Sequence, residues 1–573
     1  MYIETVPNRN SPPAILLREG WREGNKTRKR TLANLSHWPP QKIDTFRRLL
    51  DDQPLVSAQD LLRTHKTLPH GHVQAILTAI RKLGIDTLLS AKRCPERDLV
   101  LAMIVQRLLF PCSKLATARH WHSTTLAEEL ELGEANQEDL YRALDWLLER
   151  QPRIEKKLAQ RHLSEDCLVL YDVSSSYYEG HSCPLARYGH NRDGKPALPI
   201  IVYGVMTDGE GRPIAVEVYP GNTGDPSTVP DQVEKLRTRF QLSRVVLVGD
   251  RGMLTQPQID KMNSAAGLGW ITALTSVAIG GLLARGDLQL SLLDEQNLAE
   301  IRSPEYPGER LVVCHNPLLE QQRSRKRQEL LAATEKALEK IRQQVQRRKR
   351  KPMQQAEIGL KVGKVLGHYK MGKHLLCTIA DGSFHWERRE ESIEQEASLD
   401  GIYVIRTSEA AERLSAADTV RSYKSLAQVE RAFRSLKGLD LLIRPIHHRT
   451  EDRVPAHIFL CLLAYYVEWH LRRVWAPLLF EDEQLAQQRR QRDPVLPASC
   501  SESAPQKKFT RQTTEGFPVH SFATLLKELA SRARVTYSLK SDGSSPTFQQ
   551  LPEPTPLQAK AYDLLHLLPV TGN

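Results

Sequence analysis

The spacing of hydrophobic residues differs between two parts of the chain. Between residues 71 and 165, apolar positions recur every three or four residues, which predicts a compact group of helices. Beyond that point, short apolar runs such as Leu168–Val173 and Val245–Val248 alternate with helical segments, and the strand pattern returns at Gly401–Arg406. Strands that alternate with helices are typical of a mixed sheet with at least one parallel crossover, so we expect the fold class α/β.

The segment Tyr423–Lys437 predicts a single amphipathic helix, because it has no Gly or Pro and one β-branched residue. Its apolar stripe consists of Leu426, Val429, Phe433 and Leu436. Tyr423, Glu430 and Lys437 are seven residues apart, so they fall on one line at the edge of that stripe. A phenol, a carboxylate and an ammonium in a line suit a phosphate backbone and a hard cation. The charged edge of an ordinary amphipathic helix explains them equally well.

Two aspartates share one position relative to a strand. Asp172 and Asp250 each close an apolar run, so both carboxylates are expected at the carboxyl edge of the sheet. Alone, each fits a turn residue at a strand end, but Glu430 follows on a helix just after the strand pattern returns. Three hard oxygen ligands from separate elements favour Mg²⁺ or Mn²⁺ over zinc. Two such ions about 4 Å apart can serve phosphodiester chemistry, so the three carboxylates predict a metal-dependent catalytic site.

The length and the net charge of the chain limit the kinds of protein that it can be. A chain of 573 residues is expected to form two to four domains, and its 80 Lys and Arg against 68 Asp and Glu give a formal charge of +12. This excess favours nucleic acid as partner. The eight cysteines are scattered and form no C-x-x-C pair, so neither a zinc finger nor a disulfide framework is indicated. With no signal peptide at the start, and Ile458–Val467 too short to span a bilayer, we expect a cytoplasmic protein without a membrane partner.

Two basic segments are further candidates for DNA contact. Ala14–Arg18 and Thr27–Leu32 predict a hairpin rich in Arg and Lys, which fits a DNA backbone or a solvated edge ribbon equally well. A long charged helix is expected over Gln321–Arg350 and ends in an unmixed basic run: Arg347, Arg348, Lys349, Arg350 and Lys351. The mixed first half of this helix fits a solvated surface, whereas the run of one sign is better evidence for DNA.

The helix motif resembles one known family. Its pattern of Tyr423, Glu430 and Lys437 is similar to the Y-x2-R-x3-E-x6-K helix of the DDE transposases of bacterial insertion sequences. Leu426 stands where the family has its arginine, which removes one expected DNA contact and leaves the metal site intact.

The two aspartate motifs extend this resemblance. The segment D-V-S-S-S-Y-Y-E-G at 172–180 is similar to the family's first acidic motif, and G-D-R-G-M at 249–253 is similar to its second. The resemblance covers roughly Asn25–Leu471. It implies an RNase H-like core with an insertion before the glutamate helix, and the 180 residues between Asp250 and Glu430 fit that layout.

The resemblance also implies roles for particular residues. The implied catalytic residues and ligands of two Mg²⁺ or Mn²⁺ ions are Asp172, Asp250 and Glu430. The implied or expected DNA-binding residues are Tyr423, Lys437 and Arg251, with the run Arg347–Lys351. The implied reaction is cleavage of double-stranded DNA at terminal inverted repeats and transfer to target DNA, by a homodimer at the bacterial nucleoid. Two alternatives stay open: a metal-dependent nuclease without strand transfer, and a catalytically decayed DNA-binding repressor.

These expectations give a domain plan. It comprises an N-terminal basic hairpin and linker at 1–70, a helical domain for DNA ends at 71–165, the first part of the RNase H-like core at 166–276, an inserted domain at 277–399, the second part of the core with the glutamate helix at 400–479, and a linker with a C-terminal helical region at 480–573. Within this plan, Lys361–Val365 predicts a strand and Phe480–Phe517 a loop or flexible linker.

Overall fold

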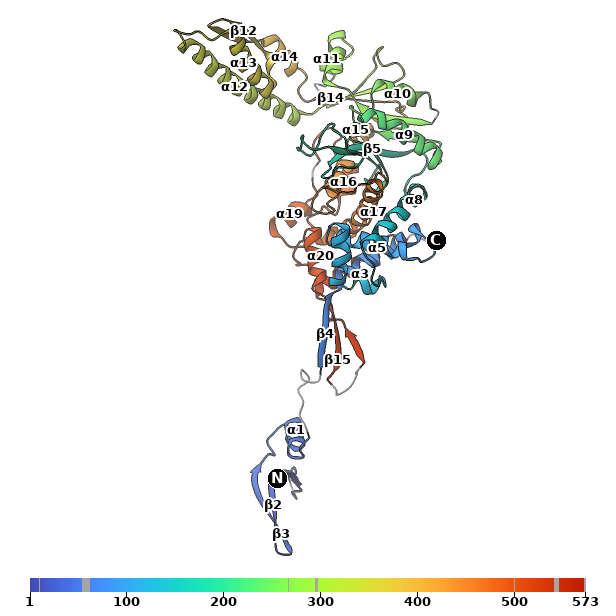
Figure 1. Cartoon of the computed structure of the whole chain (residues 1–573), viewed down its shortest axis with the longest axis vertical. Coiled ribbons are helices and arrows are strands. Elements are labelled where there is room, and N and C mark those ends of the chain that lie inside the picture. The colour runs from blue at the N-terminus through green and yellow to red at the C-terminus, as the bar shows by residue number, and fades with distance from the viewer. Residues whose placement is uncertain are drawn as a thin grey trace. The chain divides into compact units, whose positions relative to one another are not determined.

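The computed structural model describes residues 1–9, 11–53, 62–265, 267–293, 297–498, 500–540 and 546–570 (Figure 1). The chain divides into two units. The first unit holds residues 1–69 and 532–553, and the second holds residues 70–531 and 554–573.

The first unit contains two antiparallel three-stranded sheets. One has the order β1-β2-β3, formed by Tyr2–Val6, Ala14–Glu23 and Lys26–Asn34, and α1 follows at Pro40–Leu50. The other has the order β16-β15-β4, formed by Thr547–Gln550, Ala533–Leu539 and Leu62–Pro69.

The predicted hairpin is confirmed as β2 and β3, which are longer than expected. The strand β1 was not predicted, and it brings an acid to the basic ribbon. Glu4 accepts hydrogen bonds from Arg18 at 2.7 Å and from Lys29 at 3.1 Å. Part of the hairpin's positive charge is therefore neutralised within the unit.

The second unit begins with the predicted helices. They are α3 Gly71–Lys82, α4 Ile85–Leu89, α5 Pro95–Leu109, α6 Lys114–His120 and α8 Gln137–His162. Asn136 caps α8, since its side chain accepts from the backbone N–H groups of Glu138 and Asp139. The apolar helix α17, Arg453–Val474, packs against α5 and α8 (Figure 1).

Helix α17 confirms the buried helix predicted at Ile458–Val467. In the described part of the chain it is the one helix long and apolar enough to cross a membrane by itself, and 89% of its most apolar window is buried inside the protein. Helix α5 passes the same test only as a pair with the helix after it, at a bend of 92°.

An eight-stranded mixed sheet forms the centre of the second unit. Its order is β10-β11-β14-β9-β8-β5-β6-β7. The strands are β5 Cys167–Tyr177, β6 Ile200–Asp208, β7 Pro213–Pro220, β8 Val245–Val248, β9 Leu268–Ala273, β10 Leu298–Ile301, β11 Arg310–His315 and β14 Ile402–Thr407. Strands β5, β8 and β9 run parallel, and the other pairs are antiparallel. The predicted mixed sheet with a parallel crossover is confirmed.

Two connections after β7 and β8 are helical. The first consists of α9 Val229–Glu234 and a π-helical turn at Lys235–Arg239, and the second is α10 Gln256–Asn263.

The segment 277–399 contributes both to the sheet and to a body with its own core. After α11 Ser276–Arg285, β10 and β11 extend the sheet. The rest comprises α12 Pro317–Arg347, α13 Gln355–Tyr369, β12 Leu375–Ala380, β13 Ser383–Arg388 and α14 Glu390–Ala397. The strand predicted at Lys361–Val365 is wrong, because these residues belong to α13. Ile358 and Val362 are one helical turn apart and both buried. Their packing on one face therefore favours a helix, although β-branched residues in this segment favour a strand.

The predicted helix Tyr423–Lys437 is broken. Helix α15 spans Ala416–Lys424 and α16 spans Ala427–Lys437. At the break, the hydroxyl of Ser425 donates to the carbonyl of Ser422 at 2.6 Å, a local bond that competes with the helical ladder. Tyr423 therefore belongs to another helix than Glu430 and Lys437, and the expected single line of three side chains does not form.

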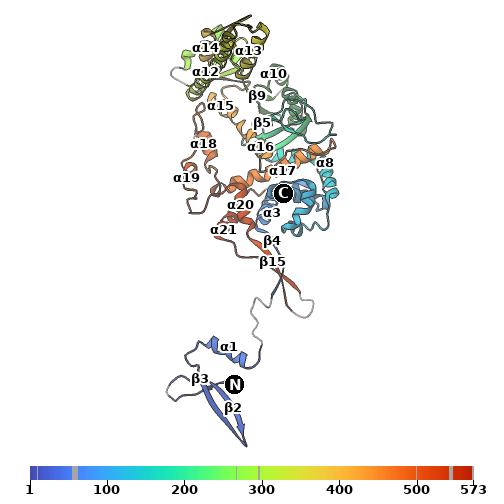
Figure 2. The same ribbon diagram turned by 60° about the vertical axis from the view of Figure 1, so that its left-hand side comes forward.

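The loop predicted at Phe480–Phe517 is wrong in part. It contains α18 Leu485–Gln491 and α19 Ser503–Thr510. Figure 2 shows both beside α15 and α16, on the side away from β5. The chain then forms α20 Phe522–Ala530 and α21 Pro556–Leu564, within the C-terminal helical region expected from the sequence.

Candidate active site

Strands β5 and β8 place Asp172 and Asp250 at the same level of the sheet. Their parallel register pairs Leu170 with Val248, and each aspartate lies two residues beyond that pair. Asp250 follows the end of β8, as predicted, but β5 continues to Tyr177, so Asp172 lies inside its strand. Pairing with β6 extends β5 beyond the point where the apolar run stops.

Helix α16 brings Glu430 over the same strands. Its buried face includes Val429 and Phe433, and the Phe433 ring meets Tyr203 of β6 edge-on at 5.9 Å between centroids. The helix packs against β5 and β6. Glu430 is on the exposed face of the helix, next in sequence to buried Val429.

The three carboxylates interact electrostatically. Burial raises the pKa of Asp172 to about 6, and the negative charges of Asp250 and Glu430 act in the same direction. The Val173 N–H, which donates to Asp172 at 2.7 Å, and the Arg192 guanidinium both act to lower that pKa. The net rise means that negative charge at Asp172 is unfavourable without a cation.

The donor set fits a divalent ion by its chemistry. Carboxylate oxygens are the ligands that Mg²⁺ and Mn²⁺ prefer, and a cation would relieve the repulsion felt by Asp172. In the ranges that the structure describes, however, no three His, Cys, Asp or Glu residues are grouped closely enough to hold one ion. For all three carboxylates to hold one ion, they would have to come closer together than they are here.

Tyr423 contacts a carboxylate directly. Its hydroxyl donates to Oδ1 of Asp250 at 3.2 Å. Burial raises the pKa of the phenol, and the Asp250 and Glu430 charges act in the same direction. The phenol therefore stays protonated and acts as a hydrogen-bond donor to the site. In the structure the partner of the Tyr423 hydroxyl is therefore the Asp250 carboxylate, whereas the sequence predicts a DNA phosphate as its partner.

Lys437 also has a partner that the sequence did not reveal. Its Nζ lies 3.2 Å from Oδ1 of Asp193, whose side chain is 1% exposed. Arg444 pairs with the same oxygen, and the Tyr177 N–H donates to Oδ2 at 3.0 Å. Asp193, Arg444 and the nearby Arg192 were missed by sequence reasoning. The run R-D-G at 192–194 predicts a turn, but no spacing links that turn to α16.

The other expected DNA-binding residues lie at the surface. Arg251 is exposed and makes no ion pair among the described residues. Of the run Arg347–Lys351, Arg348 pairs with Glu357 at 3.3 Å and stays 55% exposed. No residue of the run forms a hydrogen bond or an ion pair with Tyr423 or the three carboxylates.

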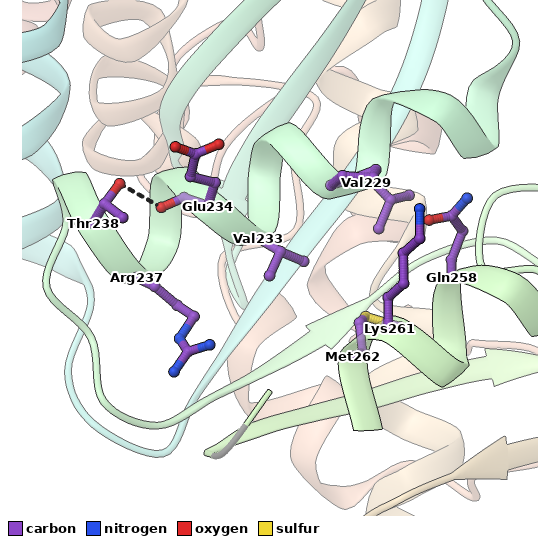
Figure 3. Close-up of a pocket in the computed structure, with 9 residues that line it drawn as sticks. Val229, Val233, Glu234, Arg237, Thr238, Gln258, Lys261 and Met262 are labelled. Atoms are coloured by element: carbon purple, nitrogen blue, oxygen red, sulfur yellow. Dashed lines mark hydrogen bonds between the residues drawn. The ribbon is translucent and has the colours of Figure 1, made fainter. Parts of the chain in front are cut away.

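Two cavities of the second unit lie near the sheet and the helices after it. One, of about 490 Å³, lies between α9 with its π-helical turn and α10, and Val233, Arg237 and Lys261 line it (Figure 3). The other, of about 770 Å³, lies between α15–α16, α17 and α18. The three carboxylates line neither of these cavities.

Comparison with known protein families identifies the family to which this chain belongs. Residues 164–467 match the transposase DDE domain, which is more than half of the chain. The protein is a DDE transposase. In addition, residues 3–59 match the N-terminal domain of the IS1634 family of transposases, an insertion-sequence family. The predicted family and the predicted transposase function are both confirmed.

The matched DDE domain contains every residue of the candidate active site. It runs from just before β5 into α17, whereas α18 lies beyond it. No curated protein matches the transposase in sequence. A cryo-EM structure of the piggyBac transposase synaptic complex with hairpin DNA matches with 10% identity and a TM-score of 0.33, covering 80% of this chain and 77% of that chain. A TM-score this low does not establish a common fold.

Proposed function

We propose that this transposase cuts DNA strands at the ends of an insertion sequence and joins the freed 3′-hydroxyl to target DNA, with Asp172, Asp250 and Glu430 as its catalytic residues. One observation supports this most strongly: the parallel register of β5 and β8 brings Asp172 and Asp250 to one level of the sheet, and the negative charges of Asp250 and Glu430 both act on Asp172. Such a cluster is unfavourable unless a cation neutralises it.

We also propose that the core is RNase H-like. The order β7-β6-β5-β8-β9 supports this, with three antiparallel strands followed by two parallel ones. In this arrangement the central strand β5 carries Asp172 and its parallel neighbour β8 leads to Asp250. Strands β14, β11 and β10 then extend the sheet on one side.

The three carboxylates would hold two Mg²⁺ or Mn²⁺ ions. When bound, such ions supply an activated oxygen nucleophile and stabilise the leaving oxygen of the cut phosphodiester. The Tyr423 hydroxyl fixes Asp250 through its hydrogen bond, and Arg192 favours the charged form of Asp172. Exposed Arg251, next to Asp250, is suited to a phosphate of the cut strand.

Double-stranded DNA with terminal inverted repeats and a target duplex are the proposed partners. The helical region 71–165 and the basic N-terminal hairpin are candidates for holding the ends. Because an element has two ends and each chain has one set of carboxylates, we propose a homodimer on DNA. The run Arg347–Lys351 adds sequence-independent contacts to the backbone.

The test is strand cutting on DNA that carries the terminal repeats. With Mg²⁺, the wild type should give nicked and joined products, whereas Asp250→Asn and Glu430→Gln should bind the DNA and cut none of it. Asp231→Asn, an exposed aspartate on α9, serves as a matched control and should keep full activity. Cutting without joined product would indicate a nuclease, and binding without cutting by the wild type would indicate a decayed repressor. Retained cutting by Glu430→Gln would remove that residue from the site.

A further inference from the structure

The larger cavity lies on another side of α16 than the candidate active site. Gln428, Arg431 and Ser435 line it, at spacings that form one helical face. At about 100° per residue, Glu430 points roughly 160° away from Gln428. In Figure 2, α18 lies on one side of α15 and α16, and β5 lies on the other. A ligand in this cavity would therefore contact the back of the helix that carries Glu430.

The lining of this cavity is strongly basic. Eight Lys or Arg side chains and five Asp or Glu side chains line it. The acids already have partners: Glu481 accepts from Arg431 and Arg472, each at 2.9 Å, and Glu210 pairs with Arg473. Among the described residues, none of these acids forms an ion pair with the cations contributed by α18 and the residues just after it.

Three of these cations form no ion pair with a described residue, although the charge of Glu210 acts on Arg489 and Arg490. Among the described residues, Arg489, Arg490 and Arg492 form no side-chain hydrogen bond or ion pair, and Nε of Arg492 is buried without an acceptor. Burial lowers the pKa of Arg489 to about 10, and the positive charges of Arg431 and Arg492 act in the same direction. Arginines held together against their mutual repulsion form a site to which an anion would bind favourably.

We propose that this cavity is a second phosphate-binding site, separate from the carboxylates, in which Arg489, Arg490 and Arg492 bind the phosphates of a polyanion. The planar guanidinium matches the oxygens of a phosphate group, and three of them suit consecutive phosphates. The cavity of about 770 Å³ accepts a ligand of nucleotide size. The phosphates could come from a DNA strand outside the reacting position or from a free nucleotide.

A phosphate in this cavity would connect two parts of the transposase. Arg489 and Arg490 belong to α18, outside the matched DDE domain, while Arg431 belongs to α16. An anion shared among them would hold α18 against the back of α16. Binding here is then expected to stabilise the helix that carries Glu430 without contacting the carboxylates.

The test compares two variants of the full chain in the absence of divalent metal, so that binding is measured without cutting. In the test variant, Arg489, Arg490 and Arg492 are replaced by Gln. In the control, three exposed and unpaired cations elsewhere in the second unit are replaced by Gln: Arg237, Lys261 and Arg302. Both changes remove the same charge, so only the site differs.

Two measurements identify the source of the phosphates. For a short duplex of random sequence, the slope of log affinity against log salt should fall by between two and three in the test variant, about 0.9 per contact, relative to the control. For ATP, calorimetry should show binding to the wild type and control that is absent from the test variant. Either result supports the site and names its ligand. If neither binding changes relative to the control, the proposal is overturned.

Misfolding of the triple variant is controlled by Arg490→Gln alone. This side chain is exposed and unpaired, so its replacement leaves the packing intact. The duplex slope should fall by about 0.9, or ATP affinity should drop, while near-ultraviolet circular dichroism stays unchanged. No change in either ligand would again overturn the site. Neither binding measurement requires DNA cutting. The phosphate-binding site can therefore be tested even if the proposed catalytic function is wrong.

Discussion

The ion pair between Lys437 and Asp193 makes a prediction that separates two roles for the lysine. If Lys437 contacts DNA, as the helix motif predicts, then its replacement should leave the stability of the free protein unchanged. If Asp193 holds it, as the structure places it, then the two residues should be energetically coupled. We therefore predict the outcome of a double-mutant cycle with Asp193→Ala and Lys437→Met.

The magnitudes follow from what each replacement leaves behind. In Asp193→Ala, Lys437 keeps its charge with a side chain only 11% exposed, and the Tyr177 N–H is left without its acceptor. Breaking a buried pair in this way costs about 3–5 kcal/mol. In Lys437→Met, Asp193 still has Arg444 and the Tyr177 N–H, so the cost is about 1–2 kcal/mol. The double variant has no ammonium left buried without a partner. Its loss of unfolding free energy should therefore be about 2 kcal/mol smaller than the sum of the losses in the two single variants.

The assay is urea unfolding of the four full-length proteins, followed by tryptophan fluorescence, together with duplex binding at several salt concentrations. The ion-pair role predicts a coupling of about 2 kcal/mol and a Lys437→Met variant whose salt slope stays within a few tenths of the wild type. Additive costs, with a slope that falls by about 0.9, would refute this reasoning. Such a result would mean that Lys437 leaves Asp193 for a DNA phosphate.

Three further outcomes are expected. Tyr423→Phe should lower the free energy of unfolding by about 1 kcal/mol and leave the affinity for duplex DNA unchanged in the absence of divalent metal, because its hydroxyl donates to Asp250; weaker duplex binding without metal, measured by fluorescence anisotropy, would place the hydroxyl on DNA instead. Replacing Arg347–Lys351 by Gln should reduce the salt slope of DNA binding by about 0.9 for every DNA phosphate that the run binds, and an unchanged slope would show that the run faces solvent. Burial lowers the pKa of Lys114, which is 4% exposed, from 10.5 to about 7. The unfolded state then binds more protons between about pH 7 and 10.5, so wild-type stability should rise with pH across that window. Lys114→Met should remove the rise and gain at most about 5 kcal/mol at pH 7, as urea unfolding at each pH would show.

The sequence predicted the sheet and the level of the aspartates because both depend on local pattern. Apolar runs specify strands β5 and β8, and the parallel register then brings Asp172 and Asp250 to one level. The end of β5 was not predicted, since its continuation to Tyr177 depends on pairing with β6 across the following loop. Hydrophobic period alone cannot reveal such tertiary pairing.

The contacts that Tyr423 and Lys437 make could not be predicted from the sequence, for a different reason. The spacing of Tyr423, Glu430 and Lys437 was correct as a pattern, but the bond of the Ser425 hydroxyl to the backbone breaks the helix between the first two. Asp193 reaches Lys437 from a loop 244 residues away in sequence. A single sequence has no signal for either contact.

The partners of Tyr423 and Lys437 suggest what changes when DNA binds. In the free protein both side chains point at carboxylates, Asp250 and Asp193, so neither is available to a phosphate. The three proposed catalytic carboxylates are also not grouped closely enough for all three to hold one ion. A cation that neutralises Asp250 would weaken the acceptor that holds the Tyr423 hydroxyl and at the same time draw Glu430 inward. If Asp250 holds a metal as proposed, metal binding and release of the phenol to DNA are therefore expected to be coupled, and the phenol and Glu430 belong to separate helices, α15 and α16.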